Sequence, residues 1–320
     1  MTATASNPHS GLGIDLGDHL DRYAQVPTGV RLCHRVSDPA AGSEEHPVPL
    51  VLVSGLSQDQ TAWPEPMLDV LAQRGLRVIT LDNRDSGRST RFESQRLASK
   101  LDLLRATAPT GSYTLEDMGA DVIGLLDHLD LERVHLAGMS MGGMIGQVVA
   151  STIPERIASF TSIFSTTGQG KVGQPAKATM VRFAARAPRD EMEGVTTHLT
   201  MTRYLAGRDY PPDVEVEVAM ALRTWRRGAG PRNGAAVVRQ ISAIQASGDR
   251  TASLSRITAP TLVLNGDRDP MVAPSGGLAT HRAIVGSRHQ VITGMGHHIG
   301  PGLDVMLGAM VADHAWAAGR

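Results

Sequence analysis

The sequence predicts an α/β protein whose mostly parallel sheet is covered by helices on both faces. Short, continuously apolar runs, which suit strands buried on both sides, alternate with stretches of helical periodicity. One pentapeptide, Gly-Met-Ser-Met-Gly at 138–142, stands directly between such a run and a helix-like stretch. With 320 residues the chain can bury a substantial core, in one large domain or two smaller ones.

The strands and helices are expected in a regular order along the chain. Short β-like runs predict strands at 30–36, which alternates loosely, and at 49–53, 77–81, 134–137, 157–164, 260–265 and 289–292. Helix-like stretches are expected at 63–74, 115–129, 141–150 and 303–316, and the second carries apolar residues at helical spacing from Met118 to Leu129. This alternation is typical of a parallel sheet covered by helices.

The stretch 166–255 interrupts the alternation. It is rich in Ala, Arg, Met and Glu, is broken by Pro and Gly, and predicts several helices and no strand. Because it precedes the last two strands, we expect a helical cap over the carboxyl edge of the sheet, where ligands bind in open α/β sheets. The predicted organisation is a loose N-terminal tail at 1–20, a core at 21–165 and 256–320, and a cap at 166–255.

The composition argues against several classes of function. Lys and Arg number 31 against 32 Asp and Glu, so the chain lacks the basic footprint of a protein that binds nucleic acid or an anionic membrane. No run is long enough to span a membrane, and the start lacks the pattern of a signal peptide. The single cysteine, Cys33, excludes an internal disulfide and favours a reducing cytoplasm. We expect a cytoplasmic protein without a nucleic-acid or membrane partner, of undetermined oligomeric state.

The pentapeptide 138–142 has the pattern and the setting of a serine nucleophile elbow, in which a tight turn joins a strand to a helix. Gly138 and Gly142 lack the Cβ atoms that would clash at so sharp a turn, and Ser140 is expected in a strained backbone conformation. The helix N-terminus behind the serine favours developing negative charge. A chain rich in Gly and Ser also produces this pattern by chance. Candidate acid and base residues elsewhere in the sequence must therefore distinguish a true elbow from a chance match.

A serine hydroxyl becomes a good nucleophile only with a base and a third group that orients the base. In the elbow arrangement the acid follows a late strand, and here both Asp267 and Asp269 follow the strand at 260–265. We favour Asp269, because the chain has turned by that point and Pro270 stiffens the residues after it. Asp267 comes earlier and is expected to bind the turn itself.

The base is expected after the last strand, where His297 and His298 are the candidates. His297 follows a Gly-Met-Gly loop, whose flexibility would let the ring reach back to a distant serine. We therefore favour His297, with the ring of His298 directed to the cap or to solvent.

Negative charge that develops on a carbonyl oxygen needs backbone N–H donors. One donor is expected to be Met141, immediately after the serine. The second is expected in the loop after the strand at 49–53, where Gly55 permits close approach, and we assign it to Leu56. No metal-ligand spacing and no nucleotide-binding glycine motif is present in the sequence, so neither a metal nor a cofactor is expected.

As an ordered set, these segments resemble the α/β-hydrolase superfamily from about Arg22 to Trp316. The motifs are Ser54-Gly55, residues 82–89, the elbow, residues 266–270 and residues 294–297. Ser54 stands where many members have His, which changes the support of the loop but not the backbone donor. The resemblance implies a mostly parallel eight-stranded sheet flanked by helices, an inserted helical cap, and a cofactor-free triad of Ser140, His297 and Asp269.

Trp63-Pro64 and residues 84–89 are most similar to the branch that contains aclacinomycin methylesterase. This branch implies a carboxylic-ester hydrolase that acts on a small-molecule ester through an acyl-enzyme intermediate. Lactonases, C–C bond hydrolases and cofactor-free perhydrolases use the same elbow and are alternatives. A ligand-binding protein on a hydrolase fold is a further alternative of another class.

Two charged clusters are expected to have structural roles. Arg84 and Asp85 are interpreted as a buried or half-buried pair that braces the loops of the site. Arginines gather around Trp225 in the predicted cap and are interpreted as a solvated helix face, at Arg223, Arg226, Arg227 and Arg232.

Overall fold

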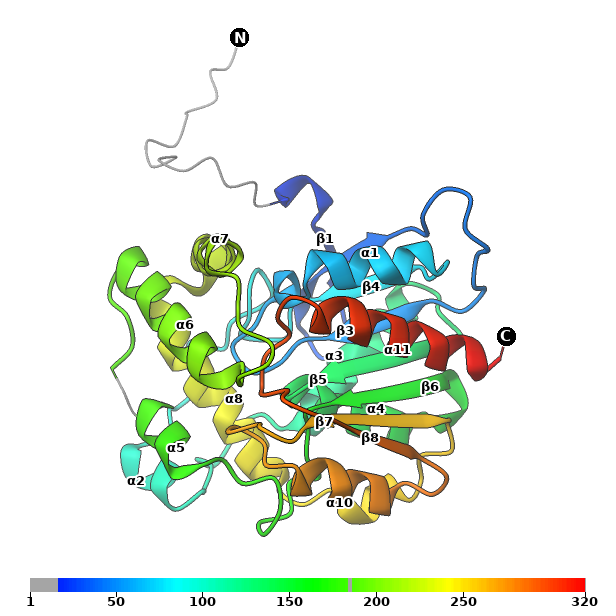
Figure 1. Cartoon of the computed structure of the whole chain (residues 1–320). Helices are drawn as coiled ribbons and strands as arrows, with labels where there is room; N and C mark the ends of the chain where they lie inside the picture. The colour runs from blue at the N-terminus through cyan, green and yellow to red at the C-terminus, as the bar shows by residue number, and fades with distance from the viewer. Residues whose placement is uncertain (1–16, 184–185, 320) are drawn as a thin grey trace.

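The computed structural model describes residues 17–183 and 186–319 and contains one eight-stranded sheet (Figure 1). Its strand order is β1-β2-β4-β3-β5-β6-β7-β8, with β1, β2 and β4 paired antiparallel and all remaining pairs parallel. The mostly parallel eight-stranded sheet is therefore confirmed. The strands are β1 (Arg22–Gln25), β2 (Arg31–Ser37), β3 (Leu50–Val53), β4 (Val78–Leu81), β5 (Val134–Met139), β6 (Ile157–Ile163), β7 (Thr261–Gly266) and β8 (Arg288–Ile292).

Helices cover both faces of the sheet (Figure 1). On one face α1 (Glu65–Gln73) packs beside α11 (Leu303–Ala317). The other face is covered chiefly by α3 (Leu115–His128) and α4 (Met141–Thr152), with α9 (Thr251–Leu254) and α10 (Ser275–Ala283) beyond them.

The apolar strands divide their side chains between these two layers. In β3, Val51 and Val53 join the core that includes α3 and α4, whereas Leu50 and Leu52 join the core that includes α1 and α11. Side chains of a strand alternate between its faces, so a strand with a core on each side is apolar at every position. This double burial explains why β3 is an unbroken apolar run in the sequence.

The register of the sheet brings its functional loops to one edge. Val53 at the end of β3 lies opposite Gly138 of β5, and Ile163 of β6 lies opposite both Met139 and Leu264. Because these strands run parallel, the loops that follow them meet at the carboxyl edge of the sheet.

Three elements were not predicted from the sequence. Strand β1 lies at the edge and buries only one of its four residues, so it has no apolar run. Helix α10 begins Ser-Gly-Gly and has no apolar stripe, and α2 (Lys100–Leu104) is a short turn with a capping box at Ser99. Most of the predicted tail lies outside the described residues, but Asp18–Leu20 at its end form a 3-10 turn that an Arg88–Asp18 ion pair holds at 2.5 Å.

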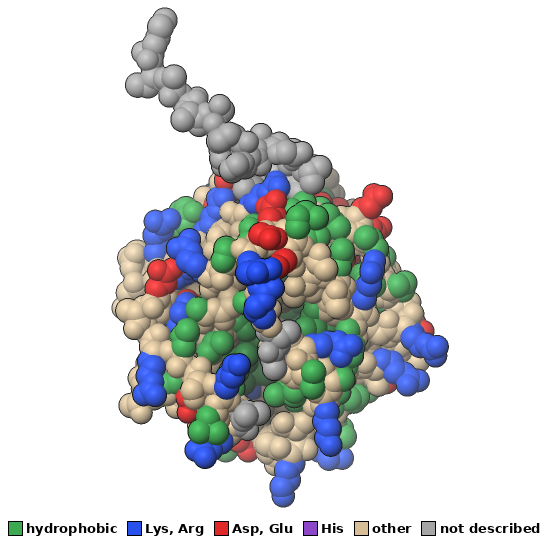
Figure 2. Space-filling view, turned by 90° about the vertical axis from the view of Figure 1, so that its left-hand side faces the viewer, with side chains coloured by type: hydrophobic (Ala, Val, Ile, Leu, Met, Phe, Trp, Pro, Cys, Tyr) green, Lys and Arg blue, Asp and Glu red, His purple; other side chains and the backbone are tan. Residues whose placement is uncertain are grey.

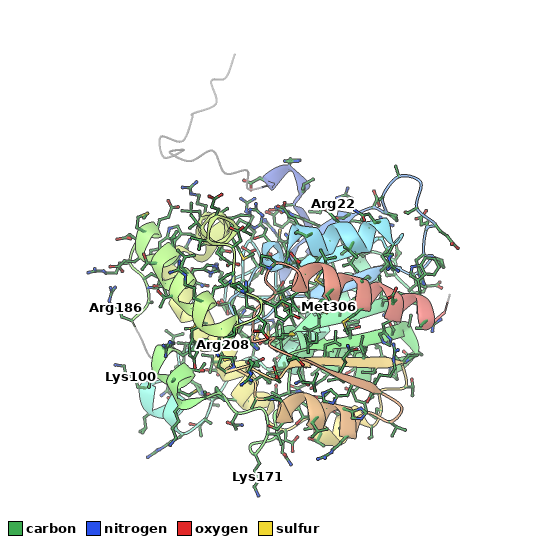
Figure 3. All side chains as sticks on the ribbon, in the orientation of Figure 1. Arg22, Lys100, Lys171, Arg186, Arg208 and Met306 are labelled. Atoms are coloured by element: carbon green, nitrogen blue, oxygen red, sulfur yellow. The ribbon has the colours of Figure 1, made fainter. Side chains whose placement is uncertain are left out.

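Between β6 and β7 the chain forms helices that lie beyond the carboxyl edge of the sheet (Figure 1). They are α5 (Lys177–Phe183), α6 (Glu191–Leu205), α7 (Val214–Thr224) and α8 (Asn233–Ser247). The described part of this segment contains no strand. Figure 2 shows Lys and Arg side chains spread over the face that these helices form, and in Figure 3 Arg186 extends outward from it. The division into tail, core and cap stays a prediction.

Across residues 17–183 and 186–319, no helix combines the length and the apolar character that crossing a membrane requires.

One arginine of this segment is buried among acidic residues. Arg227 lies in the π-helical turn η4 (Trp225–Ala229), and its side chain is fully buried. Its guanidinium lies 2.9 Å from Asp21, 3.5 Å from Asp59 and 3.2 Å from Asp82. The predicted solvated face is therefore wrong for Arg227, because its partners come from three distant segments. The other three arginines form more exposed ion pairs, Arg223–Glu65, Arg226–Glu191 and Arg232–Glu93.

A buried carboxylate on α7 connects the helices between β6 and β7 to the loop after β8. Glu217 is 3% exposed and lies 2.6 Å from His198 Nε2 on α6 and 3.0 Å from His298 Nε2 after β8. Burial pulls the pKa of Glu217 upward, but its interactions with the two imidazoles outweigh burial and hold that pKa at about 2. Glu217 is therefore ionised at neutral pH and joins two helices to the loop after β8.

Arg227→Met should lower the free energy of unfolding by about 3–5 kcal/mol, because buried carboxylates lose their guanidinium partner. Arg226→Met is the matched control, since its ion pair with Glu191 is partly exposed and contributes at most about 1 kcal/mol. Urea unfolding of both variants checks this. Equal losses would contradict the role given to Arg227.

Glu217 should make stability depend on pH at the acid end. Its folded pKa of about 2 lies below the ordinary value of 4.5, so its contribution is complete above pH 4.5 and is lost as pH falls toward 2. In urea unfolding between pH 6 and pH 3, the difference in stability between the native protein and Glu217→Gln should therefore shrink as pH falls. Parallel stability curves would show that the carboxylate contributes nothing.

Candidate active site

Ser140 stands at the sharp turn between β5 and α4. Its backbone has φ 54° and ψ -119°, a left-handed conformation that side chains rarely adopt, so the predicted strain is present. A Cβ atom on Gly142 would overlap the carbonyl oxygen of Val53, and one on Gly138 would overlap the carbonyl of Gly142. The two glycines thus have the steric role that the sequence indicated.

The three side chains predicted to work together lie in one hydrogen-bonded row. His297 Nε2 is 2.9 Å from Ser140 Oγ, and His297 Nδ1 is 2.7 Å from Asp269 Oδ2. They come from the ends of β5, β8 and β7, which the register of the sheet aligns. A carboxylate only accepts, so Nδ1 donates to Asp269, and Nε2 is left to accept from the serine hydroxyl.

The carboxylate of Asp269 is held in place on its other side. Its Oδ1 accepts the N–H groups of Met271 and Val272 at 2.7 and 2.8 Å, and its side chain is fully buried. Asp267, the alternative acid, instead accepts the Gly294 N–H at 2.7 Å and so holds the loop that leads to His297. The structure brings Asp269, and not Asp267, to the imidazole.

Gly296, in the loop before His297, has a steric role. The last turn of α6 packs directly on it: His297 N–H donates to Leu205 O at 2.7 Å, and Gly296 N–H donates to Ala206 O at 3.2 Å. A Cβ atom on Gly296 would overlap Leu205 O. At Gly296, glycine therefore permits close approach of the helix end, whose carbonyls lack partners within the helix.

Two neighbouring rings complete the surroundings of His297. Phe164, directly after β6, packs against its imidazole with ring centroids 4.5 Å apart. His298 is turned toward Glu217 of α7, in keeping with the predicted direction of its ring.

The loop after β3 lies against the elbow. A Cβ atom on Gly55 would lie 2.6 Å from Gln58 Oε1 and 3.3 Å from Ser140 Cβ, so glycine at this position lets the loop pack tightly against the elbow. Ser54, the departure from the usual His, donates its hydroxyl to Asp59 O at 3.2 Å and so supports the loop differently. Among the described residues, neither Leu56 N–H nor Met141 N–H has a hydrogen-bond acceptor, so both predicted donors remain available beside Ser140.

Arg84 and Asp85 are buried but are not partners of each other. Arg84 forms a bidentate pair with Asp121 on α3, at 2.6 and 2.8 Å. Asp85 forms a second bidentate pair with Arg239 on α8, also at 2.6 and 2.8 Å. The predicted burial of Arg84 and Asp85 is confirmed, but each residue pairs with a counter-charge on a distant helix and not with the other.

Sequence reasoning missed the residues of α6, α7 and α8 that contact the site. They are Leu205, Glu217 and Gln240, whose contacts depend on how these helices sit on the sheet. Each is an ordinary helical residue in the sequence, so no local pattern could have identified it.

Comparison with known proteins identifies the family to which this fold belongs. The family model for the alpha/beta hydrolase fold matches residues 48–300. The rhodomycin D methylesterase DnrP of Streptomyces peucetius is 27% identical over 290 residues, covering 84% of this chain and 91% of that protein. The relatives of this chain include methylesterases and an enol-lactonase.

Solved structures show the same architecture. The enol-lactonase from Burkholderia xenovorans LB400 superposes with a TM-score of 0.66 at 25% identity, covering 92% of this chain and 99% of that one. The esterase RhEst1 from Rhodococcus sp. ECU1013 gives a TM-score of 0.71 at 22% identity, covering 94% and 100%, which is a likeness of fold. Since the family model spans most of its length, this chain belongs to the α/β-hydrolase family.

Proposed function

We propose that this protein is a serine hydrolase that cleaves a carboxylic ester of a small molecule. The observation that carries the proposal is the row of Ser140, His297 and Asp269, joined at 2.9 and 2.7 Å. The methylesterase relative supports an ester as the substrate.

In this proposal Ser140 Oγ attacks the ester carbonyl while His297 Nε2 takes the hydroxyl proton. Asp269 keeps Nδ1 protonated and stabilises the imidazolium that forms. The Leu56 and Met141 N–H groups bind the oxyanion. The alcohol leaves with the proton from His297, and water then attacks the acyl-enzyme with the same base. No cofactor takes part.

Residues 166–255 are proposed to act as a cap that selects the substrate. The helices of this segment lie beyond the carboxyl edge of the sheet, where Ser140 stands. A lactone is the second candidate, because it is an internal ester and the Burkholderia relative is an enol-lactonase. The single cysteine, Cys33, is the basis for proposing a cytoplasmic setting.

Ser140→Ala should lower kcat on p-nitrophenyl acetate on the order of a millionfold, because the three side chains act as a unit. It should also abolish covalent labelling by a fluorophosphonate. Ser151→Ala, in the last turn of α4, is the control and should keep both properties. The proposal fails if hydrolysis survives in Ser140→Ala.

Asp269→Asn should reduce kcat on the order of 10⁴-fold, since an amide does not hold the imidazole in the correct tautomer. Asp267→Asn keeps an oxygen that can accept the Gly294 N–H and should change kcat only a few-fold. Steady-state kinetics on the same ester compares the two. A larger loss in Asp267→Asn would overturn the choice of acid.

A further inference from the structure

Most of the backbone N–H groups of residues 55–58 already have hydrogen-bond acceptors within the described chain. Gly55 N–H donates to Gln58 Oε1 at 3.0 Å, and Gln58 N–H donates to Gly55 O at 3.3 Å. Ser57 N–H donates to Gln240 Oε1 at 2.8 Å. Within the described chain only Leu56 N–H of this loop has no acceptor. The loop therefore offers one free donor, and it is the donor assigned to the oxyanion.

One of these bonds comes from far away in the chain. Gln240 lies on α8, 183 positions from Ser57, and is fully buried. Its Nε2 donates to Arg84 O at 3.0 Å and to Ser86 Oγ at 2.9 Å. The Arg84 carbonyl can only accept a hydrogen bond, and the Ser57 N–H can only donate one. The Gln240 side-chain amide must therefore direct Nε2 to Arg84 and Oε1 to Ser57.

The hydrogen bond from Gln240 is made to a strained residue of the loop 55–58. Ser57 has a φ of 61°, and a serine in this region costs on the order of 1–3 kcal/mol unless its surroundings hold it there. The peptide that carries Ser57 N–H also carries the carbonyl of Leu56. Fixing that peptide therefore limits the rotation of Leu56 and with it the direction of the Leu56 N–H.

We propose that Gln240 is a positioning residue for the oxyanion site: by binding Ser57 N–H it holds the loop in the conformation that presents Leu56 N–H to the substrate. The inference rests on the proposed ester hydrolysis at Ser140. It assigns to α8 a role in transition-state stabilisation in addition to covering the site. Gln240 does not touch the substrate and acts through the loop.

Gln240→Met removes the amide while keeping an unbranched side chain of similar length. It should lower kcat on p-nitrophenyl acetate by at least about tenfold. The loss should be smaller than the roughly 10²–10³-fold effect of removing one oxyanion donor, because Leu56 N–H is still present. KM should change little, because the oxyanion contact strengthens only in the transition state. The rate at which a fluorophosphonate labels Ser140 should fall by a similar factor, since that reaction also develops an oxyanion.

The matched control is Ser86→Ala, which removes one partner of Gln240 Nε2 and leaves the bond to Ser57 N–H in place. It should keep kcat, and thermal unfolding of both variants measures any loss of stability separately. A fall in kcat for Gln240→Met with kcat retained in Ser86→Ala supports the proposal.

The inference is overturned if Gln240→Met keeps the native kcat and labelling rate, if KM alone rises, or if Ser86→Ala loses the same activity. A native protein that neither hydrolyses esters nor labels at Ser140 would instead refute the proposed function.

Discussion

The left-handed backbone of Ser140 is the constraint on which the site depends. Such a conformation costs on the order of 1–3 kcal/mol and persists only where the surroundings determine it. Here Ser140 N–H donates to Ile163 O at 2.9 Å, and Ser165 Oγ donates to Ser140 O at 2.8 Å. Gly142 lets α4 pack against the end of β3. The parallel sheet thus supplies the rigid frame that holds the serine in its turn, and the other contacts of the site are arranged around it.

The helices between β6 and β7 touch the site at three points. The end of α6 binds the backbone of His297, Glu217 of α7 lies beside His298, and Gln240 of α8 binds Ser57. Arg227 and Arg239 fix the same segment to buried carboxylates of the core. Both the proposed base and the proposed oxyanion loop are therefore supported from the segment that is also proposed to select the substrate.

Local patterns in the sequence were sufficient to predict most strands of the sheet and the order of the candidate site residues along the chain. Gly138 and Gly142 mark a turn that few other residues permit, and Asp269 follows the buried apolar strand β7. Such features are local, because a strand buried on both faces must be apolar and a sharp turn must lack Cβ atoms. Asp267 and Asp269 could be ranked but not separated, since their hydrogen-bond partners lie on another loop.

The errors concern contacts between segments that are distant in sequence. Arg227 resembles its neighbours in the sequence and differs only in the three carboxylates that surround it. Arg84 and Asp85 are adjacent, yet each pairs with a different helix. The glycine at 296 signals close approach, but only the position of α6 shows which group approaches. The sequence gives the charge and size of each side chain, whereas the residue that it contacts depends on how distant segments pack.

The hydrogen bonds from Gly296 and His297 to the end of α6 join two parts of the molecule into one cooperative unit. The carbonyls of Leu205 and Ala206 terminate the helix, and the same carbonyls hold the backbone of the proposed base. Fraying of the last turn of α6 breaks these bonds, so the helix end and the histidine loop share a single free energy of local opening. Amide hydrogen exchange at His297 therefore reports on the integrity of a helix that begins more than a hundred residues earlier in the chain.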